Sequence, residues 1–312
     1  MESTSPLCRR LMFNSWSAMV TRRPLLRLAF TLILVALAVP ACSSQGEIFD
    51  GKRAYEHVVA QCAIGPRPVG SAEGRKTAEY ITTTLEDLGW TVEQQEFLYR
   101  GVVGRNVIAS RGSGELYLLG AHYDTRPIAD RDPTDPTQPV PGANDGASGV
   151  AVLLELARAL NVDKTGAEVW LAFFDAEDCG NINGWPFSVG AAYMAEHLSV
   201  EPVATVVVDM VGDTDQKFTW ESGSDETLNR TLWAIAAGLG YEHEFLPRIG
   251  YAIIDDHVPF LQRGFVAVDV IDFDYPYWHT TQDTPDKVGA ESLQRIGRVL
   301  EKWLEEEIPS SH

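Results

Sequence analysis

Residues able to bind a metal or move protons follow apolar segments at five places along this chain. They are His122, Asp145, the pair Glu177 and Asp178, Asp209, and His279. Two histidines with carboxylates and no cysteine form a ligand set that suits Zn²⁺ in a catalytic role, with one position left open for water or substrate. Each residue alone is typical of a cap or a surface position, but their common placement predicts metal-dependent chemistry.

Glu177 and Asp178 follow the apolar and aromatic run 169–174. That run is typical of a strand buried on both faces, and a buried strand that ends in carboxylates is how open α/β sheets present chemistry. Side chains of neighbouring residues in an extended chain point to opposite sides. One of the two carboxylates can therefore bind a metal while the other faces a substrate.

The rest of the chain supplies the strands and helices that must position these residues. Strands are predicted over 91–99, 106–110, 115–123, 169–174, 204–210 and 266–271, and helices over 55–63, 71–88, 146–160, 190–198, 225–239, 256–263 and 290–307. Strands that alternate with helices predict a single α/β domain, with a mostly parallel, mixed central sheet covered by helices on both faces.

The segment 125–142 is predicted to be a long loop rich in Pro and Asp. Loops of this length in compact domains are usually functional or disordered. Asp130, Asp132 and Asp135 resemble a calcium-binding loop, but the spaced Gly and the terminal Glu of such a loop are missing. We expect these three acids to be solvated loop charges.

The chain has 312 residues and a formal net charge of -19. Residues 1–42 hold five Arg and one acid, which leaves a net charge of -23 on the remainder. This acidic balance argues against nucleic acid or anionic lipid as a partner and suits a soluble extracytoplasmic protein. Past residue 42 the only cysteines are Cys62 and Cys179, so one disulfide is compatible with the sequence, and no Cys-x-x-Cys pair indicates a thiolate zinc site.

Residues 1–42 are predicted to be a signal segment. Arginines precede an apolar run over 28–39, and small residues lie between that run and Cys42, which is the order of a secretory signal. The run is shorter than the about 20 residues that a membrane-spanning helix needs. Cys42 resembles the lipidated cysteine of a bacterial lipoprotein and would become the new N-terminus. Pro40 departs from that pattern, so plain secretion is the alternative.

Met19 fits the start of this signal better than Met1, which suggests that the natural start lies at Met19. Residues 43–52 are expected to be a short polar linker, and residues 53–312 the catalytic domain. Both readings of the signal place that domain outside the cytoplasm, either anchored to a membrane through Cys42 or secreted.

The ordered motifs of the chain resemble the zinc-aminopeptidase family, which includes bacterial leucyl-type aminopeptidases and the glutaminyl-peptide cyclotransferases. The motifs are His122-Tyr123-Asp124, Gly142-Ala143-Asn144-Asp145-Gly146, Phe173-Phe174-Asp175-Ala176-Glu177-Asp178, Val208-Asp209-Met210-Val211-Gly212, Asp256-His257-Val258-Pro259-Phe260 and Trp278-His279-Thr280. The similarity runs from about Tyr55 to the C-terminus. It implies the phosphorylase/hydrolase-like α/β fold of that family.

Carried over by position, the resemblance implies that Asp145, Asp178 and His279 hold the main zinc. In a two-metal aminopeptidase Asp145 would also bridge to a second metal held by His122 and Asp209. Asp178 departs from the more common Glu at its position, and its shorter side chain must come closer through its backbone.

Two activities are open within the family, and Glu177 has a different task in each. In an aminopeptidase with two metals, Glu177 would deprotonate a bridging water. In a cyclotransferase with one zinc, Glu177 would take a proton from the α-amine of an N-terminal Gln and deliver it to the leaving ammonia. The nucleophile is then the substrate's own amine, which is already tethered close to the carbonyl that it attacks.

Three features favour the cyclotransferase. Asp255 precedes Asp256 where many aminopeptidases have Ser, and the matching residue of the cyclases hydrogen-bonds the catalytic acids. Trp278 directly precedes His279, as in the cyclases, where it walls the substrate pocket. Trp185 follows Glu177 and Asp178 at about the spacing at which a second pocket tryptophan follows the matching acids of the cyclases.

Other features favour the aminopeptidase. The segment 279–286 resembles the aminopeptidases, and both His122 and Asp209 are retained. The cyclases keep these two positions while binding one zinc, and Asp209 would there tune hydrogen bonds around Glu177. We therefore expect a glutaminyl-peptide cyclotransferase that acts on peptide or protein N-termini, with a two-zinc aminopeptidase as the alternative.

A more remote alternative is an inactive relative that binds peptides. The loss of Glu177 or of a metal ligand would indicate such a protein, and neither is lost. Among the remaining polar residues, Asp124 is expected to accept the second N–H of a metal-bound histidine. His257 is expected to pack near the site, and Asp283 to be structural. The oligomeric state is not specified by the sequence.

Overall fold

The computed structural model describes residues 48–308, so the predicted signal segment, Cys42 and Met19 lie outside the described residues. The helices are α1 (Gly51–Ile64), α2 (Ala72–Asp87), α3 (Ala147–Ala159), α4 (Val162–Thr165), α5 (Val189–His197), α6 (Glu226–Gly238), α7 (Val258–Gln262), α8 (Ala290–Lys302), the short 3-10 helix η1 (Pro285–Lys287) and the π-helical turn η2 (Trp303–Glu307). The strands are β1 (Thr91–Tyr99), β2 (Val102–Gly112), β3 (Leu116–His122), β4 (Glu168–Phe174), β5 (Ala204–Asp209), β6 (Phe218–Trp220), β7 (Phe245–Ile249) and β8 (Ala267–Ile271).

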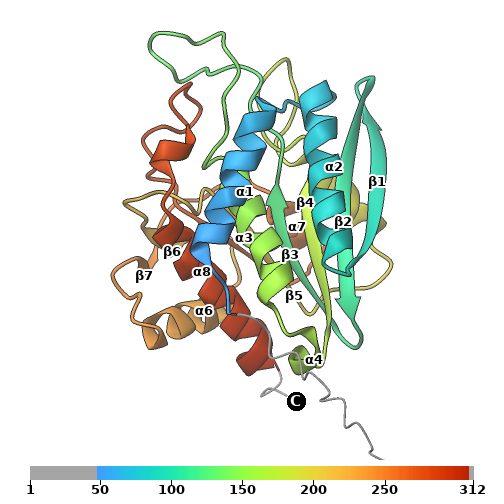
Figure 1. Cartoon of the computed structure of the whole chain (residues 1–312), viewed down its shortest axis with the longest axis vertical. Coiled ribbons are helices and arrows are strands. Elements are labelled where there is room, and N and C mark those ends of the chain that lie inside the picture. Colours follow the sequence, from blue (N-terminus) through green and yellow to red (C-terminus); the bar gives the residue numbers. More distant parts are fainter. Residues whose placement is uncertain (1–47, 309–312) are drawn as a thin grey trace, which may run out of the picture. The chain divides into compact units, whose positions relative to one another are not determined.

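Six strands form the central sheet in the order β1-β2-β4-β3-β5-β8 (Figure 1). The pairs β1–β2 and β2–β4 are antiparallel, and the pairs β4–β3, β3–β5 and β5–β8 are parallel. The mixed, mostly parallel α/β sheet expected from the sequence is therefore confirmed. From β3 the chain first adds β4 on one side and later β5 on the other, so the strand order reverses at β3, which is where open α/β sheets bind ligands.

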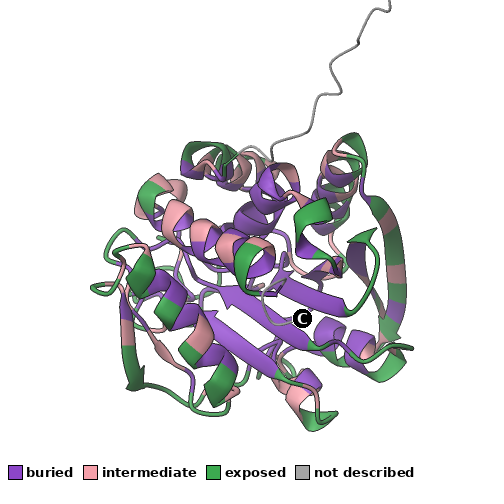
Figure 2. Ribbon diagram, turned by 90° about the horizontal axis from the view of Figure 1, so that it is seen from below, coloured by how far each residue is buried: buried purple, intermediate pink, exposed green. Residues whose placement is uncertain are grey.

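Helices cover both faces of this sheet because its strands are apolar on both sides. Leu119 and Leu171 belong to a core cluster with α1, α3 and α8, whereas Leu118 and Ala172 belong to a cluster with α5 and α7. This change from one residue to the next is the two-residue period of a strand. Figure 2 shows the strands as a buried layer between exposed helix faces.

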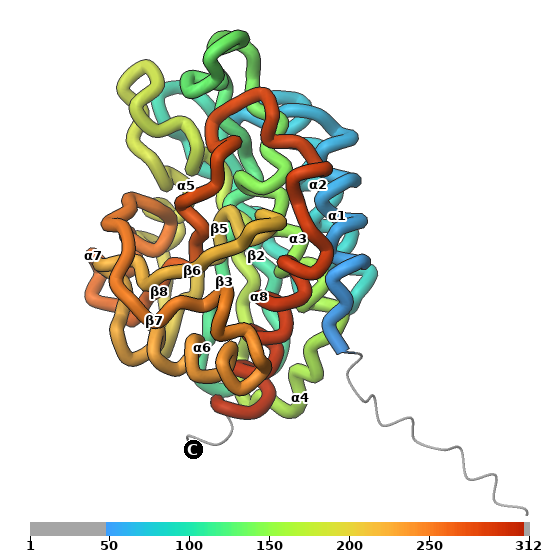
Figure 3. The backbone as a smooth tube through the Cα atoms, turned by 90° about the vertical axis from the view of Figure 1, so that its left-hand side faces the viewer, coloured from blue at the N-terminus to red at the C-terminus, as the bar shows by residue number. Residues whose placement is uncertain are grey.

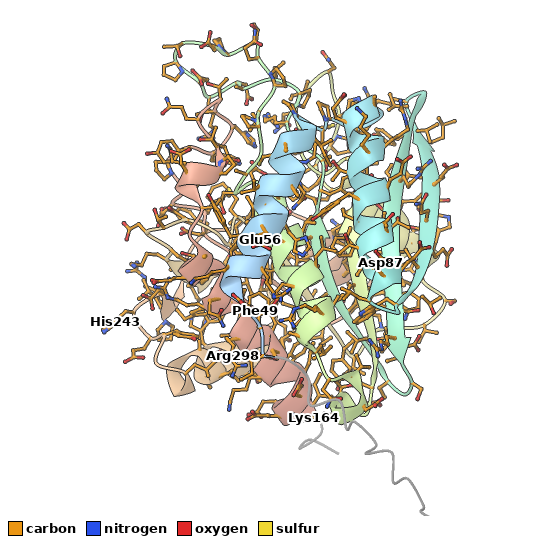
Figure 4. The ribbon with its side chains drawn as sticks, viewed as in Figure 1. Phe49, Glu56, Asp87, Lys164, His243 and Arg298 are labelled. Carbon is orange, nitrogen blue, oxygen red and sulfur yellow. The ribbon has the colours of Figure 1, made fainter. Side chains whose placement is uncertain are left out.

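The first described helix is tied to the core at its start. Asp50 accepts a hydrogen bond from the Lys52 backbone N–H at 2.9 Å, which is an N-cap. Phe49, which Figure 4 labels near the start of α1, is buried. Its backbone N–H donates to Glu301 at 3.2 Å. Helix α1 therefore begins at Gly51, four residues before the predicted helix start at residue 55 and inside the segment predicted to be a linker.

Helix α3 lies close against the sheet next to the candidate ligands. A Cβ on Gly149 would lie 2.3 Å from the Val208 carbonyl oxygen, so only glycine permits this approach of α3 to β5. Nearly every residue of α3 is buried. The position of the α3 N-terminus, which follows Asp145, is thereby fixed relative to the end of β5.

Three further features complete the described part of the chain. A second sheet of β6 and β7 was not predicted, because β6 has only three residues. Cys62 and Cys179 are free, so they do not form the disulfide that the sequence permits. Within residues 48–308, no helix has the length and hydropathy to cross a membrane.

Candidate functional site

The loops that follow β3, β4 and β8 gather at one end of the molecule (Figure 3). Strands β3, β4, β5 and β8 run parallel, so their C-terminal ends meet at this edge. His122 is the last residue of β3 and Asp209 the last residue of β5, while Glu177 and Asp178 follow β4. The topology thus brings together residues that lie far apart in the sequence.

Two groups of potential metal ligands meet at this edge and share Asp145. His122, Asp145 and Asp209 form one group, and Asp145, Asp178 and His279 form the other. In the first group His122 Nε2 lies 3.2 Å from Asp145 Oδ1 and 3.1 Å from Asp209 Oδ1. In the second group His279 Nε2 lies 3.8 Å from Asp145 Oδ2 and 3.1 Å from Asp178 Oδ1. The two oxygens of Asp145 face different histidines, which is the arrangement of a bridging carboxylate.

The donor atoms of these groups suit a cation. Their side chains are buried, and Asp145 Oδ2 and Asp178 Oδ2 have no hydrogen-bond partner among the described residues. A buried carboxylate oxygen without a partner costs free energy unless a charge or a donor compensates it. Histidine nitrogens and carboxylate oxygens are the donors that Zn²⁺ takes in catalytic sites. The group with Asp178 could hold zinc by itself, and the group with Asp209 could hold a second ion.

Burial and mutual repulsion shift the pKa values of these residues. Burial raises the pKa of Asp178 to about 6 and that of Asp209 to about 7, and neighbouring carboxylates add to both shifts. Burial opposes a charged His122, but the surrounding carboxylates, Asp209 foremost, raise its pKa well above 6.5. A bound cation would relieve the repulsion and favour ionised carboxylates with a neutral imidazole.

Asp124 holds the backbone of Glu177 and Asp178. Its carboxylate accepts hydrogen bonds from the backbone N–H groups of Glu177 at 3.0 Å and Asp178 at 3.2 Å. Its carbonyl and carboxylate oxygens also lie 3.2 Å and 3.6 Å from His122 Nδ1. This contact to the second histidine nitrogen is the supporting role expected of Asp124 from the sequence.

Asp283 holds the loop that carries Asp145. Its carboxylate accepts hydrogen bonds from the backbone N–H groups of Asn144 at 2.9 Å and Asp145 at 3.1 Å, and from the Tyr275 hydroxyl at 2.7 Å. Gly146 follows with φ of 94°, and a Cβ there would lie 3.1 Å from His122 Cε1. Glycine is therefore required where this loop passes the histidine.

Several site residues have left-handed backbone conformations that L-residues rarely adopt. Ala176 before the catalytic pair has φ of 61°, Met210 after Asp209 has 45°, and His279 itself has 58°. Such conformations cost free energy and persist where the surrounding structure enforces them, often at functional sites. Here they turn the chain sharply at the strand ends and aim the polar side chains inward.

A cavity of about 250 Å³ opens beside the ligands. Glu177 and Asp255 line it together with the apolar side chains of Ile253, Ile271, Phe273 and Trp278. Burial raises the pKa of Glu177 well above 4.5, and the charge of Asp255 adds to that shift. A carboxylate with a raised pKa in an apolar cavity is suited to receive and release a proton.

Trp278 forms an aromatic wall of this cavity. Its ring centroid lies 4.0 Å from that of His279 and 4.8 Å from that of Phe273. The Arg131 guanidinium lies 4.0 Å from the centroid of the Trp278 ring, which is a cation–π contact. The loop after β3 therefore holds the wall that the loop after β8 provides.

Two residues predicted for the pocket have different contacts in the structure. Trp185 packs against Tyr99 with ring centroids 4.8 Å apart, and Phe187 lines the cavity instead, so the predicted pocket wall is corrected to Phe187. Asp255 does line the cavity, but the hydrogen bond to Glu177 expected from the resemblance is not found between these described residues, and Asp255 Oδ2 has no partner.

The long loop contributes residues that the sequence did not single out. Arg126 is buried, and its Nη1 lies 3.4 Å from Asp178 Oδ1, while its Nε donates to Asp130 at 2.7 Å. Asp130 also lies 3.5 Å from His279 Nδ1, and Asp132 is buried and accepts from the Thr281 backbone N–H at 2.9 Å. The prediction of a solvated charge is therefore wrong for Asp132, which is buried. Asp130 is exposed as expected, although it pairs with Arg126 of its own loop and lies near His279.

His257 lies behind Asp255 and not among the two ligand groups. Its Nε2 lies 3.1 Å from Glu221 Oε2, and its Nδ1 lies 3.8 Å from Asp269 Oδ2. His257 is buried, as expected from the sequence, but Asp255, His257 and Asp269 also form a third group of potential metal ligands within the described residues. His243, by contrast, is exposed and projects from the edge of the molecule, away from these residues (Figure 4).

The profile of peptidase family M28 matches residues 106–304. The chain is similar to a Zn-dependent exopeptidase from Parabacteroides distasonis, with 30% identity, a TM-score of 0.79, and coverage of 84% of this chain and 99% of that chain. It is also similar to Bacteroides thetaiotaomicron glutaminyl cyclase bound to N-acetylhistamine, with 31% identity, a TM-score of 0.78, and coverage of 83% of this chain and 98% of that chain.

A third similarity is to the aminopeptidase YwaD of Bacillus subtilis, with 28% identity over 206 residues. The match covers 60% of this chain and only 40% of that protein. Relatives with cyclase and peptidase names therefore stand at similar distances, and the comparisons support a zinc-dependent enzyme without separating the two activities.

Proposed function

The chain belongs to peptidase family M28, and from this premise we propose that it is a glutaminyl-peptide cyclotransferase. It would convert an N-terminal Gln of a peptide or protein to pyroglutamate and release ammonia. The observation that carries this proposal is the cavity lined by Glu177, Asp255 and Trp278, which the candidate ligands Asp145, Asp178 and His279 also line. A pocket with apolar walls and a few converging polar groups is typical of a small-substrate site.

The cavity matches the chemistry of a glutamine side chain. Ile253, Ile271 and Phe273 offer apolar contacts to its methylene groups, and Trp278 covers them. The side-chain amide then points toward the ligand group, and the α-amine lies near the carboxylates. The apolar walls also keep water away from the reacting atoms, which favours ring closure over hydrolysis.

Asp145, Asp178 and His279 would hold the zinc in this reading. When bound there, zinc supplies Lewis acidity at the γ-amide carbonyl. Asp124 and Asp283 keep two of these ligands in place through their backbone N–H groups. The residues of the chain thus orient the amide before any bond is made.

Glu177 would move the proton that ring closure requires. The α-amine nitrogen forms a bond to the γ-carbonyl carbon, and the bond from that carbon to the amide nitrogen breaks. Glu177 takes the proton that the amine loses and gives it to the departing nitrogen, which leaves as ammonia. Its raised pKa makes it basic enough for the first transfer and acidic enough for the second.

Asp255 would act beside Glu177 as a second acid of the cavity. Its charge raises the pKa of Glu177, and its own oxygen Oδ2 has no partner among the described residues. Together with Glu177, Asp255 would place two acids beside the substrate α-amine in the cavity.

A two-metal aminopeptidase is the second candidate, and one observation favours it. His122 and Asp209 complete a second ligand group around Asp145. Two ions that share a carboxylate are the arrangement that activates water for peptide hydrolysis. In that case Glu177 would accept a proton from water and the chain would release free amino acids.

The metal content and the preferred substrate separate the two candidates. Purified protein would be dialysed against zinc and analysed for bound metal, and then assayed with a Gln-initiated peptide and with a leucine anilide. About one zinc per chain and turnover of the Gln peptide alone support the cyclotransferase. Two zinc ions per chain with efficient cleavage of the anilide support the aminopeptidase.

A further inference from the structure

We propose that Arg126 is a positioning residue that joins two candidate zinc ligands, Asp178 and His279, into one rigid unit. Its guanidinium contacts Asp178 directly and reaches His279 through Asp130, so that Arg126 and Asp130 together form a brace. The inference rests on the zinc site of the proposed function but is independent of the choice between cyclisation and hydrolysis, since both would use these two ligands. The proposed reaction itself assigns no task to either residue of the brace.

Arg126 is buried at the start of the long loop that follows β3. Its side chain is only 3% exposed. An arginine is almost never buried to this extent unless its charge is paired. Because the surrounding chain packs around the guanidinium, the nitrogen atoms of Arg126 act as donors in fixed positions.

One side of the guanidinium holds the turn that carries Asp178. Nη1 donates to the carbonyl oxygens of Asp178 and Gly180, each at 3.2 Å, and lies 3.4 Å from Asp178 Oδ1. The same nitrogen therefore contacts both the backbone and the carboxylate of Asp178, which restricts the rotation of that side chain. Asp178 is one methylene group shorter than the more common Glu, so its reach toward a metal depends on where its backbone is held.

The other side of the guanidinium holds Asp130. Nε of Arg126 donates to Asp130 Oδ1 and Nη2 donates to Asp130 Oδ2, both at 2.7 Å. Two parallel hydrogen bonds of this kind fix the plane of a carboxylate, which a single bond does not. The side chain of Asp130 is 39% exposed, so these two bonds keep it from turning toward solvent.

Asp130 extends the brace to His279. Its Oδ1 lies 3.5 Å from His279 Nδ1, whereas His279 Nε2 faces Asp178 and Asp145. A metal-bound histidine usually directs its second nitrogen to a carboxylate or carbonyl, which fixes the orientation of the ring. The contact of 3.1 Å between His279 Nε2 and Asp178 Oδ1 closes the ring of contacts at the place where zinc would be held.

The charges of the brace are compatible with a bound cation. An unpaired guanidinium beside the ligands would repel zinc, since like charges oppose each other strongly where water is excluded. The positive charge of Arg126 is instead paired with the carboxylate of Asp130. The brace is neutral as a whole, so it can orient both ligands without opposing the metal.

Removing the Asp130 carboxylate tests the brace at an exposed position, where the change leaves the core intact. Asp130→Ala should lower the affinity for zinc by about 10- to 100-fold, the usual scale when a group that orients a metal ligand is lost. Competition with a zinc-binding dye measures this loss. The visible absorption spectrum of the Co²⁺-loaded protein should also change, because it reports the geometry of the ligands.

Asp135→Ala is the control, since Asp135 is an exposed aspartate of the same loop. It should keep the zinc affinity and the Co²⁺ spectrum of the wild type. An Asp130→Ala protein with both wild-type values would overturn the proposed brace.

Arg126→Lys tests whether the shape of the guanidinium is needed. Lysine keeps the positive charge but has a single nitrogen, which cannot bind both oxygens of Asp130 and also hold Asp178. Zinc affinity should therefore fall about as far as in Asp130→Ala. Arg53→Lys, at an exposed arginine of α1, is the control and should bind zinc as the wild type does.

The double variant shows whether the two residues act as one unit. If they do, Arg126→Lys combined with Asp130→Ala should bind zinc no more weakly than the weaker of the two single variants. Losses of affinity that multiply in the double variant would mean that the two residues act separately, and would overturn the brace.

These readouts separate failure of the brace from failure of the proposed function. Zinc affinity and the Co²⁺ spectrum decide the brace, whichever product the enzyme forms. If the wild-type protein releases free Gln, or forms no product, while the affinities follow the expected pattern, the proposed function fails and the brace holds.

Discussion

Glu177 and Asp178 show how two neighbouring acids acquire different tasks. Asp178 Oδ1 lies 3.1 Å from His279, whereas Glu177 lines the cavity and contacts the Ser188 hydroxyl. Both backbone N–H groups donate to the single carboxylate of Asp124. Glu177 and Asp178 lie in a bend and a turn after β4 and both line the cavity, so the loop and the shared acceptor Asp124 set their different contacts, and not the alternation of a strand.

Replacing the Glu177 carboxylate tests its role as a proton carrier. Glu177→Gln keeps the size of the side chain but removes the base, so kcat should fall by about 10²- to 10⁴-fold. Zinc content should be unchanged, because Glu177 belongs to neither ligand group. Steady-state kinetics and metal analysis measure both quantities.

The matched control is Glu201→Gln, which makes the same change at an exposed acid of the loop before β5. It should leave kcat and zinc content as in the wild type. Normal turnover by Glu177→Gln would remove this residue from the reaction, and loss of zinc from that variant would make it a ligand instead.

At the scale of elements, the site exists because parallel strands end at one edge and the loops beyond them support one another. The loop after β8 returns to the loop before α3, where Asp283 accepts the backbone N–H groups of Asn144 and Asp145. The loop after β3 reaches the same place, since the Arg131 backbone N–H donates to the His279 carbonyl at 3.3 Å. Asp145 and His279, two of the candidate ligands, are therefore each held by a loop other than their own.

Removing the Asp283 carboxylate tests this support. Asp283→Ala leaves two buried backbone N–H groups and the Tyr275 hydroxyl without their acceptor. Affinity for zinc should fall by about 10- to 100-fold, as is usual when a group that orients a ligand is lost. Competition with a zinc-binding dye measures the change.

Asp286→Ala is the control, because Asp286 is exposed and lies only three positions further along the chain. Its zinc affinity should match that of the wild type. An Asp283→Ala protein that remains folded and binds zinc as tightly as the wild type would show that Asp145 needs no such support.

At the scale of the whole molecule, the fold concentrates acids at one buried place in a chain of net charge -19. Burial raises the pKa of Asp178 to about 6 and of Asp209 to about 7, from an ordinary value of 3.8. A carboxyl group whose pKa is raised by folding stabilises the folded state below its ordinary pKa, and that contribution is lost as the pH rises through the raised value. The metal-free protein should therefore lose stability as the pH rises from about 4 to about 7.

Zinc should reduce this pH dependence, because a cation favours the ionised carboxylates. Thermal unfolding of chelator-treated and zinc-loaded protein at about pH 5 and about pH 8 measures it. We expect the increase in Tm caused by zinc to be larger at the higher pH. An equal increase in Tm at both pH values would mean that zinc binding is not linked to the ionisation of these acids.

The sequence predicted the elements that carry the ligands because buried strands are continuous apolar runs. His122, Asp209 and the catalytic pair lie where such runs end, and the parallel topology alone brings them together. The β6–β7 sheet was missed, since a three-residue strand has too few positions to show a period. The contacts of Asp130 with His279 and of Asp132 with Thr281 were also missed, because these partners lie about 150 positions later.

The residues of the pocket were predicted less well than the candidate metal ligands, again because residues distant in the sequence meet there. Trp278 lines the cavity as expected, since its position next to His279 fixes it there. Trp185 does not line the cavity, and Phe187 lines it instead. The spacing of residues along a loop does not determine which side chain turns inward. Residues next to a ligand are thus predictable from spacing, whereas residues in long loops depend on packing.

The products formed from a Gln-initiated peptide test the central claim most directly. Zinc-loaded protein would be incubated with such a peptide, and the products identified by mass spectrometry together with an ammonia assay. We predict a pyroglutamyl peptide of unchanged residue number and one ammonia for each peptide converted. Free glutamine and a peptide shortened by one residue, without ammonia, would contradict the cyclotransferase and establish the aminopeptidase.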